Sequence, residues 1–438
     1  MKFRTRIIRA LTVALLLIGA TGVNAQKPAA GEKNVVTPDS NSAPAARLEE
    51  LRAAGFEALY NLDYETARRN FKEIARLFPD HPASPQFLAA TLWAQTLNES
   101  RRLQSSLYNT ESFYAQKEDK PDPRMVEEFR ALTRNAAQLA KARLRRNPKD
   151  VEALYFLGAT EGLKAAFAAA VQRSFTSALS DGSSSVDRHR AVIKLDPNFH
   201  DAELTIGFYD YVVGSLPAPV KLLASIIGTR GSKKRGLLTL QRVASEGRWA
   251  RDDARALLIV LLKREKRYEE ALAISREMSV KYPRNYLFKL ETADALVSIA
   301  AAKRRAGQAA EAAKTELEVL TVFDSLLRDR ATREAATRSL DLIHFRYGEA
   351  LLEADKAETA AQEFLAAASV AGAEPGLTTM AHLKAARAFD LAGKRNDALA
   401  HYRIVLQRPD VMDAHDEAKQ GLKEPYKPKK SEKSIEEE

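Results

Sequence analysis

The histidines and one glycine-rich loop are the residues of this sequence that most resemble reactive groups. The seven histidines are scattered and include no His-Glu-x-x-His pattern, which a zinc hydrolase would need. No Gly-x-Ser-x-Gly nucleophile turn occurs, and residues 228–236 lack the spacing of a phosphate-binding loop. His200, Asp201 and Glu203 resemble a metal-ligand set, but at an expected helix start such residues are typical of capping and solvent-facing groups. We therefore expect no enzyme activity, no metal site, no cofactor and no small-molecule substrate.

The N-terminus has the features of an export signal. Four basic residues accompany an apolar stretch at 11–20, and the small residues before Gln26 suit cleavage after Ala25. The apolar stretch is short for a membrane span, and an uncleaved anchor is the alternative. The sequence has no cysteine, so neither disulfides nor cysteine-ligated metals contribute to its stability. We expect an exported protein that is periplasmic, associated with the cell envelope, or secreted.

The positive charge is concentrated at one place. The formal net charge of +10 falls to +6 when the four basic signal residues are removed, and the segment from Arg230 to Arg251 alone carries that surplus. Nucleic-acid binding would need a broader basic surface with interleaved aromatic residues, and export removes such a partner. An anionic surface is the alternative ligand, and its candidate contacts are Arg230, Lys233, Lys234 and Arg235.

A ladder of small and large residues recurs at intervals of about 40 residues. Gly55 is followed by Ala67 after twelve residues, by Phe71 after four more and by Pro79 after eight. Small residues let two antiparallel helices approach, the aromatic residue fills the space between units, and proline ends the second helix. The clearest further copies are Gly348, Ala360, Phe364, Gly372 and Ala386, Ala398, Tyr402, Asp410.

Each such helix pair leaves one apolar flank uncovered, so the pairs must stack on one another. The pattern resembles the tetratricopeptide repeat (TPR) family over most of residues 48–420. The resemblance implies an all-α fold, an α-solenoid of stacked helix-turn-helix repeats in a right-handed superhelix. A non-repeating helical bundle is the alternative. The predicted segments are a signal peptide at 1–25, a disordered linker at 26–46, N-terminal repeats at 47–200, an irregular middle repeat with an apolar and basic insert at 201–250, C-terminal repeats with a capping helix at 251–422, and a charged disordered tail at 423–438.

Residues 207–262 resemble, in addition, the core signature of the eukaryotic inclusion-body clearance family. Its members are TPR proteins associated with mitochondrial outer membranes and lipid droplets. The sequence departs from the family at 231–233, where Gly-Ser-Lys replaces the Gly-Asp-Arg that the family tends to carry. The resemblance implies a shared architectural element more than a shared role. The matching residues are Gly207, Ser215-Leu216-Pro217, Lys221-Leu222-Leu223, Gly228, Gly231, Arg235-Gly236-Leu237 and Leu240.

Protein recognition is the function that these patterns favour. In TPR arrays the first helix of each pair lines a groove, and aromatic residues there suit the capture of a peptide or a partner helix. The alternative for each residue is packing inside the array. We expect a non-catalytic exported scaffold that binds a protein partner, or alternatively a peripheral membrane protein that contacts anionic lipid or an envelope assembly through residues 216–251. The predicted groove residues are Arg52, Phe56, Tyr60, Tyr155, Leu204, Phe208, Tyr211, Phe345, Glu349 and Arg387.

Overall fold

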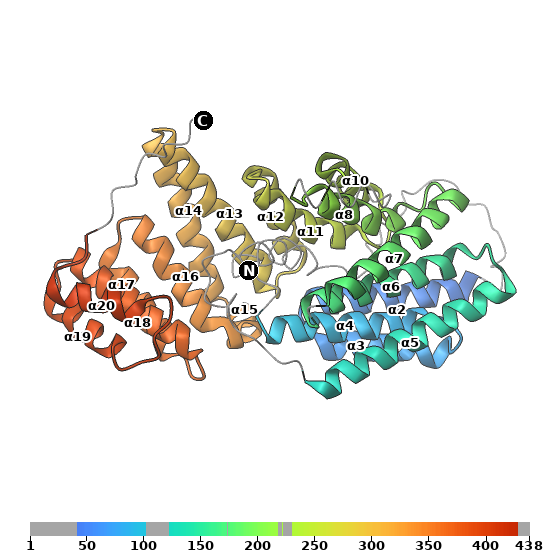
Figure 1. Cartoon of the computed structure of the whole chain (residues 1–438), viewed down its shortest axis with the longest axis horizontal. Coiled ribbons are helices and arrows are strands. Elements are labelled where there is room, and N and C mark those ends of the chain that lie inside the picture. The colour runs from blue at the N-terminus through green and yellow to red at the C-terminus, as the bar shows by residue number, and fades with distance from the viewer. Residues whose placement is uncertain (1–41, 102–121, 173, 218–220, 222–229, 428–438) are drawn as a thin grey trace. The chain divides into compact units, whose positions relative to one another are not determined.

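The computed structural model describes residues 42–101, 122–172, 174–217, 221 and 230–427. These residues form 18 α-helices and two short 3-10 helices, and none of them lies in a strand (Figure 1). They form two compact units with a boundary between Glu291 and Thr292. The predicted signal peptide and most of the apolar insert, 218–220 and 222–229, lie outside the described residues.

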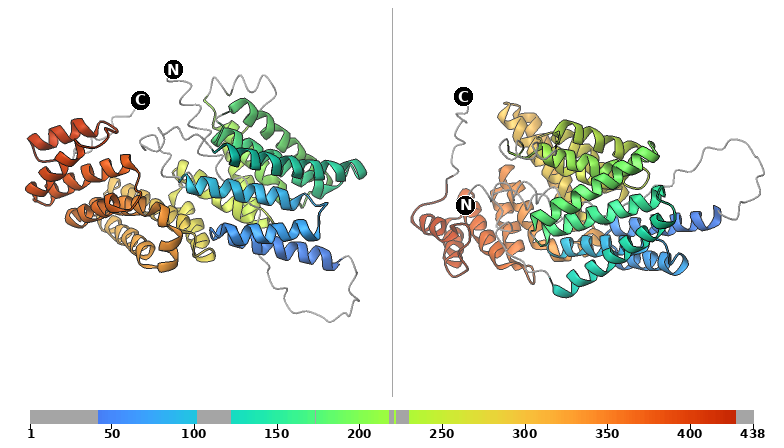
Figure 2. Two further views of the ribbon diagram at one scale, coloured as in Figure 1. Left: turned by 90° about the horizontal axis from the view of Figure 1, so that it is seen from below. Right: turned by 45° about the vertical axis from the view of Figure 1, so that its right-hand side comes forward.

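Unit 1, the described residues up to Glu291, is a succession of helix pairs. Each helix contacts the next one along the chain, and α6 and α7 lie side by side in Figures 1 and 2. A 3-10 helix, η3 (His200–Ala202), precedes the fourth pair. The pairs are α2 (Ser42–Tyr60) with α3 (Tyr64–Leu77), α4 (Ala83–Glu99) with α5 (Pro123–Arg146), α6 (Val151–Ala170) with α7 (Phe175–Leu195), α8 (Glu203–Gly214) with α10 (Lys233–Glu246), and α11 (Arg251–Arg264) with α12 (Tyr268–Lys281).

Unit 2, the described residues from Thr292 onward, continues the helical pattern. The predicted capping helix corresponds to α20, and the segment 424–427 after it is placed, although we expected disorder from 423 onward. Figure 2 shows α16 to α20 in orange and red. The helices are α13 (Tyr286–Arg305, which begins in unit 1), α14 (Ala309–Arg328), α15 (Arg330–Ala335), η4 (Thr337–Ser339), α16 (Leu340–Glu353), α17 (Ala357–Ser369), α18 (Pro375–Leu391), α19 (Arg395–Val405) and α20 (Ala414–Lys423).

The aromatic residue of the ladder packs against the glycine of its own helix pair, whereas we expected small residues to meet there and the aromatic residue to fill the space between units. A Cβ atom on Gly348 of α16 would lie 2.8 Å from Cε1 of Phe364 on α17, so only glycine allows this approach. Local signals start the helices: the Asp63 carboxylate accepts from the Thr66 amide at 3.1 Å before α3, and Asp150 accepts from the Ala153 amide at 2.9 Å before α6. Helix pairing is thus encoded by the ladder, and the helix starts by acidic caps.

Unit 1 also closes on itself. One apolar core joins residues of α2, α3, α4 and α6 to residues of α11, α12 and the start of α13. The Tyr60 hydroxyl at the end of α2 donates to the Asp253 carboxylate, and the Asn285 side-chain amide donates to the Tyr60 carbonyl at 2.6 Å. The first helix pair of this unit therefore contacts the last one, and the apolar flank of α2 is covered within the unit.

Candidate protein-binding surfaces

The predicted groove residues of α2 and α6 are buried in unit 1. Phe56 is 0% exposed and packs between the rings of Phe71 and Phe87, at centroid distances of 5.0 and 4.8 Å. Tyr60 stacks on Tyr282 at 4.8 Å, and Tyr155 is 2% exposed. These rings are core residues in this conformation, because α2 packs against α11 and the start of α13.

Arg52 is likewise covered, despite its charge. It pairs with Glu49, and its guanidinium lies 5.0 Å from the centroid of the Trp249 ring. Burial lowers the pKa of the Arg52 guanidinium, while the Glu49 carboxylate opposes that shift. The side chain is 3% exposed, so it joins α2 to the Trp249 loop instead of facing a ligand.

The predicted groove residues of α8 are also interior. Leu204, Phe208 and Tyr211 belong to the second apolar core of unit 1. The Tyr211 hydroxyl donates to Glu265 at 2.7 Å, and burial is the main cause that raises the pKa of Tyr211. The alternative weighed from the sequence, packing inside the array, therefore describes all seven predicted groove residues of unit 1: Arg52, Phe56, Tyr60, Tyr155, Leu204, Phe208 and Tyr211.

Unit 2 presents a different face, formed by the first helices α13, α16, α18 and α20. An ion-pair chain crosses it: Asp294 pairs with Arg346 at 2.8 Å, and Arg346 with Glu349 at 2.9 Å. Glu349 also approaches Lys384 at 3.5 Å. We call this surface, together with the adjacent pair of Arg387 on α18 and Glu417 on α20, the charged face of unit 2.

The residues of the charged face are accessible, except Asp294, which is 8% exposed. The side chains of Arg346, Glu349, Lys384 and Arg387 are 20–29% exposed, and that of Glu417 is 42% exposed. The structure thus places the predicted residues Glu349 and Arg387 on one surface. The third predicted residue, Phe345, is 9% exposed and packs edge-on against Phe364 at 5.3 Å.

Sequence reasoning missed Asp294, Arg346, Lys384 and Glu417. Arg346 and Lys384 each lie two positions before the small residue of their ladder. We predicted the groove residues only from other positions of the ladder. A search for charge at that position in consecutive copies would have found both residues. Asp294 and Glu417 lie on helices without a clear ladder, and no comparable signal marks them.

Two of the four predicted contacts to an anionic surface are already neutralised. Arg235 forms a two-point ion pair with Asp210, whose side chain is 7% exposed, and Lys233 pairs with Glu265 at 2.8 Å. Arg230 and Lys234 are exposed and form no ion pair with any residue that the structure describes. Only these two cations of the set remain available to a ligand.

Glycine contacts hold the backbones of α8 and α10 together. A Cβ on Gly236 would lie 2.6 Å from the Gly207 carbonyl oxygen and 2.6 Å from the Tyr211 amide nitrogen. A Cβ on Gly231 would lie 2.6 Å from the Asp210 carbonyl oxygen. Since both clashes involve backbone atoms, neither helix can move aside without separating the hairpin. Gly207, Gly231 and Gly236, the described glycines of the inclusion-body clearance resemblance, therefore have an architectural role here.

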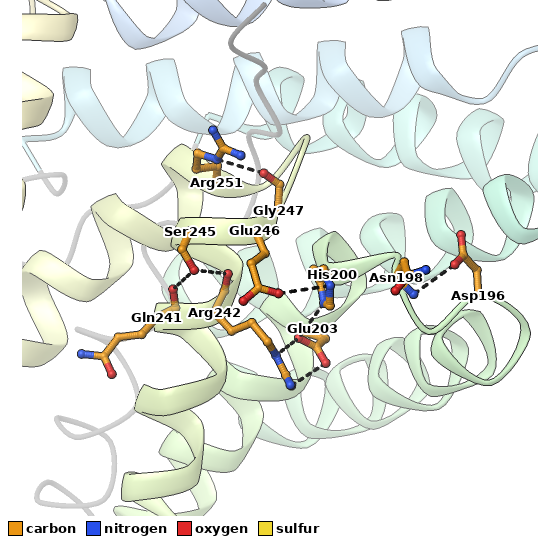
Figure 3. Close-up of polar contacts among 10 residues, drawn as sticks. All are labelled: Asp196, Asn198, His200, Glu203, Gln241, Arg242, Ser245, Glu246, Gly247 and Arg251. Atoms are coloured by element: carbon orange, nitrogen blue, oxygen red, sulfur yellow. Dashed lines mark hydrogen bonds and ion pairs between the residues drawn. The ribbon is translucent and has the colours of Figure 1, made fainter. Parts of the chain in front are cut away.

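His200 and its acidic neighbours form ion pairs next to this hairpin (Figure 3). His200 lies 3.5 Å from Glu203 and 3.3 Å from Glu246, and Arg242 donates two hydrogen bonds to Glu203 at 2.6 and 2.7 Å. Asp201 caps α11 instead, since it accepts from the Trp249 and Ala250 amides at 2.5 and 2.7 Å. No group of three or more His, Asp or Glu side chains among the described residues is placed so that it could hold a metal ion.

None of the described helices is long and apolar enough to cross a bilayer.

Comparisons with known proteins find similarity only to solved structures. No family model and no curated protein matches the sequence. Among solved structures, the human IFIT1 dimer with m7Gppp-AAAA is 12% identical and has a TM-score of 0.39, with 89% of this chain and 86% of that chain covered. A tetratricopeptide repeat protein from Parabacteroides merdae is 13% identical, with a TM-score of 0.28 and coverage of 77% and 99%. Yeast Tom70 is 11% identical, with a TM-score of 0.26 and coverage of 88% and 96%.

The fold is an α-solenoid of TPR-like helix pairs. The helix pairs, the glycine–aromatic contacts within them and the capping helix α20 agree with this class. The fold alone does not assign a partner.

Proposed function

We propose that this chain is a non-catalytic scaffold that binds a protein partner through the charged face of unit 2. The observation that carries the proposal is the ion-pair chain from Asp294 through Arg346 and Glu349 to Lys384, which spans three first helices. All of its side chains except the buried Asp294 are partly exposed. The corresponding helices of unit 1 present buried aromatic residues to one another instead. Unit 2 thus offers side chains that a ligand can reach.

The geometry favours a charged peptide or helix as the ligand. Each carboxylate of the chain lies next to a cation, so a partner with alternating charges can exchange these ion pairs one for one. Such exchange leaves no buried charge unpaired, and it gives specificity and fast association more than tight binding. A purely apolar partner would remove water from these ion pairs and offer them no new polar contact.

Site-specific photo-cross-linking in the producing cell tests this proposal. A photoreactive amino acid at Lys384 should capture a defined partner, whereas the same group at Gln362, exposed on α17, should not. Adding Arg387→Glu should reduce the Lys384 product at least tenfold, because it reverses charge on the same face. Equal capture from both positions, or capture insensitive to Arg387→Glu, would refute the proposal.

We propose further that the protein is exported and acts in the periplasm or cell envelope or outside the cell. The basic and apolar pattern of residues 1–20 supports this location. N-terminal sequencing of the protein from fractionated cells should give Gln26 as the first residue. An intact Met1 in the cytoplasmic fraction would contradict export.

A second candidate function is peripheral contact with an anionic membrane through the α8–α10 hairpin. It is favoured by Arg230 and Lys234, which lie exposed and outside the ion pairs of the hairpin, and by Leu238, which is 57% exposed on the same helix as Lys234. The resemblance to the inclusion-body clearance family agrees with this location. The glycine contacts of the hairpin support shared architecture and do not by themselves indicate lipid.

A further inference from the structure

The segment that follows α20 turns back onto the charged face. Glu424 is extended, with φ −142° and ψ 148°. The Tyr426 amide donates to Oδ2 of Asp390 on α18 at 2.8 Å, and the Tyr426 ring covers the Arg387 guanidinium, 4.8 Å from its centroid. Arg387 is also the partner of Glu417, so the tyrosine covers one end of the charged face.

The Asp390 side chain is held in place by contacts with other residues of unit 2. Its side chain is fully buried, and it accepts from Arg395 at 2.9 Å and from the Tyr402 hydroxyl at 3.0 Å. Arg395 donates in addition to the Gly421 carbonyl at 2.7 Å, at the end of α20. The carboxylate is therefore held in place whether or not a peptide amide binds to it.

The segment itself is held at few points. Glu424, Pro425 and Lys427 are exposed, and only Tyr426 is partly buried. An extended backbone with one amide on a carboxylate and one aromatic ring on a guanidinium makes contacts that any tyrosine-containing peptide can make. No described contact requires this peptide to belong to the same chain.

We propose that residues 424–427 are an intramolecular ligand that covers a tyrosine subsite built from Arg387 and Asp390. The partner of the charged face displaces it with an extended segment that carries a tyrosine of its own. The inference rests on the proposed scaffold function and specifies the chemistry of its ligand. In the absence of a partner, the C-terminal segment occupies the subsite, so a partner must compete with this segment in order to bind.

Peptide binding in trans tests the subsite without an identified partner. The probe is a fluorescein-labelled peptide of residues 424–430, Glu-Pro-Tyr-Lys-Pro-Lys-Lys, in fluorescence anisotropy with the full chain. It should bind the Tyr426→Ala chain at least tenfold more tightly than the wild type. Replacing the tyrosine of the peptide by alanine, or adding Arg387→Met to the Tyr426→Ala chain, should each weaken binding at least tenfold. Equal binding to the wild-type and Tyr426→Ala chains would overturn the proposal and leave Tyr426 as an end cap.

A second measurement uses only the wild-type chain. Hydrogen exchange of the 424–427 amides should accelerate when the unlabelled peptide is added at millimolar concentration, while exchange in α18 should not. Unchanged exchange would overturn displacement even if Tyr426→Ala destabilises the unit. A wild-type dimer that becomes a monomer with Tyr426→Ala would instead show that a second copy supplies the tyrosine. If a partner cross-links at Lys384 and the added peptide does not reduce this product, the proposed scaffold function would stand and only this inference would be rejected.

Discussion

Gly55 on α2 lies directly against the ring of Phe71 on α3: a Cβ atom at position 55 would be 2.7 Å from Cζ and 2.8 Å from Cδ1 of that ring. The same relationship recurs in unit 2 between Gly348 and Phe364, and Gly421 lies equally close to Tyr402. The contact is thus a repeated device that sets the spacing of the two helices in a pair.

Gly55→Ala should lower the free energy of unfolding of unit 1 by about 1–3 kcal/mol, because overpacking outweighs the roughly 1 kcal/mol that alanine contributes to a helix. The matched control is Gly182→Ala in α7, where the nearest atom, Ala165 Cβ, would be 3.8 Å away. That variant should gain about 0.5–1 kcal/mol. Urea unfolding followed by tryptophan fluorescence measures both, since the two tryptophans, Trp93 and Trp249, belong to unit 1. Equal stabilisation by the two substitutions would contradict this view of the pair.

The ladder allowed the helix pairs to be predicted because its contacts join residues sixteen positions apart, as in Gly55 and Phe71. The closure of unit 1 was not predictable in this way. Tyr60 and Asp253 are 193 positions apart, and no periodicity links them. One signal was nevertheless present: the groove positions of unit 1 are mostly apolar, whereas Glu349 and Arg387 in unit 2 are charged. Apolar positions indicate a covered face, so this difference could have distinguished the two surfaces, although we predicted a single groove from both sets of residues.

His189 on α7 should make the stability of unit 1 sensitive to acid. Its Nε2 lies 3.2 Å from the Tyr155 carbonyl, which only accepts, so Nε2 carries the proton and Nδ1 accepts from Thr205 at 2.9 Å. Burial lowers the pKa of His189 from 6.5 to about 4. Because the folded pKa lies below the unfolded one, stability is intact above pH 6.5 and is lost as the pH falls towards 4, by about 2 kcal/mol at pH 5.

The control for this effect is His189→Gln, which keeps a donor and an acceptor but does not titrate. Its loss of stability between pH 7.5 and pH 5, followed by tryptophan fluorescence, should be about 2 kcal/mol smaller than that of the wild type. An identical loss in both proteins would show that other groups dominate the acid response.

Asp252 and Asp253 are adjacent in sequence, but removal of the charge should cost much more stability at Asp252 than at Asp253. Asp252 accepts from Lys281 at 2.5 Å, from the Tyr282 hydroxyl at 2.6 Å and from Arg255 at 3.1 Å. Asp252→Asn should therefore cost about 2–4 kcal/mol, because Lys281 loses its carboxylate partner and Arg255 keeps only Glu277. Burial raises the pKa of Asp253 well above its usual range, and one of its oxygens has no hydrogen-bond partner. Asp253→Asn should cost less than about 1 kcal/mol.

The stability of Asp253→Asn relative to the wild type should change with pH in one direction. With a folded pKa above the unfolded one, Asp253 contributes most below the unfolded pKa, and that contribution falls as the pH rises through the folded pKa. Asp253→Asn should thus become more stable relative to the wild type as the pH rises, in the same urea experiment. A fixed difference between the two proteins from pH 5 to pH 8 would contradict a raised pKa at Asp253.

The ion pairs of the charged face should differ in their contribution to stability. Asp294 is 8% exposed and depends on Arg346, so Arg346→Met should lower the stability of unit 2 by about 2–4 kcal/mol. Lys384→Met should change it by less than about 1 kcal/mol, since Lys384 approaches Glu349 only at 3.5 Å and both side chains are partly exposed. Circular dichroism during urea unfolding measures the difference. Equal effects would mean that burial of Asp294 does not set the energy of this pair.

The four cations near the start of α10 should differ in their effect. Lys233 and Arg235 should stabilise unit 1, whereas Arg230 and Lys234 should not. Lys233→Met with Arg235→Met should lower the stability of unit 1 by about 1–3 kcal/mol, because Glu265 loses a partner and the 7%-exposed Asp210 side chain is left unpaired. Arg230→Gln with Lys234→Gln should leave stability unchanged.

If the hairpin contacts lipid, Arg230→Gln with Lys234→Gln should weaken binding in flotation with phosphatidylserine-containing vesicles by about 30-fold at low salt, at about 1 kcal/mol per cation. Neutral phosphatidylcholine vesicles are the control. Flotation that is absent in the wild type, or unaffected by Arg230→Gln and Lys234→Gln, would reject the membrane function while leaving the scaffold proposal intact, because the two surfaces lie in different units.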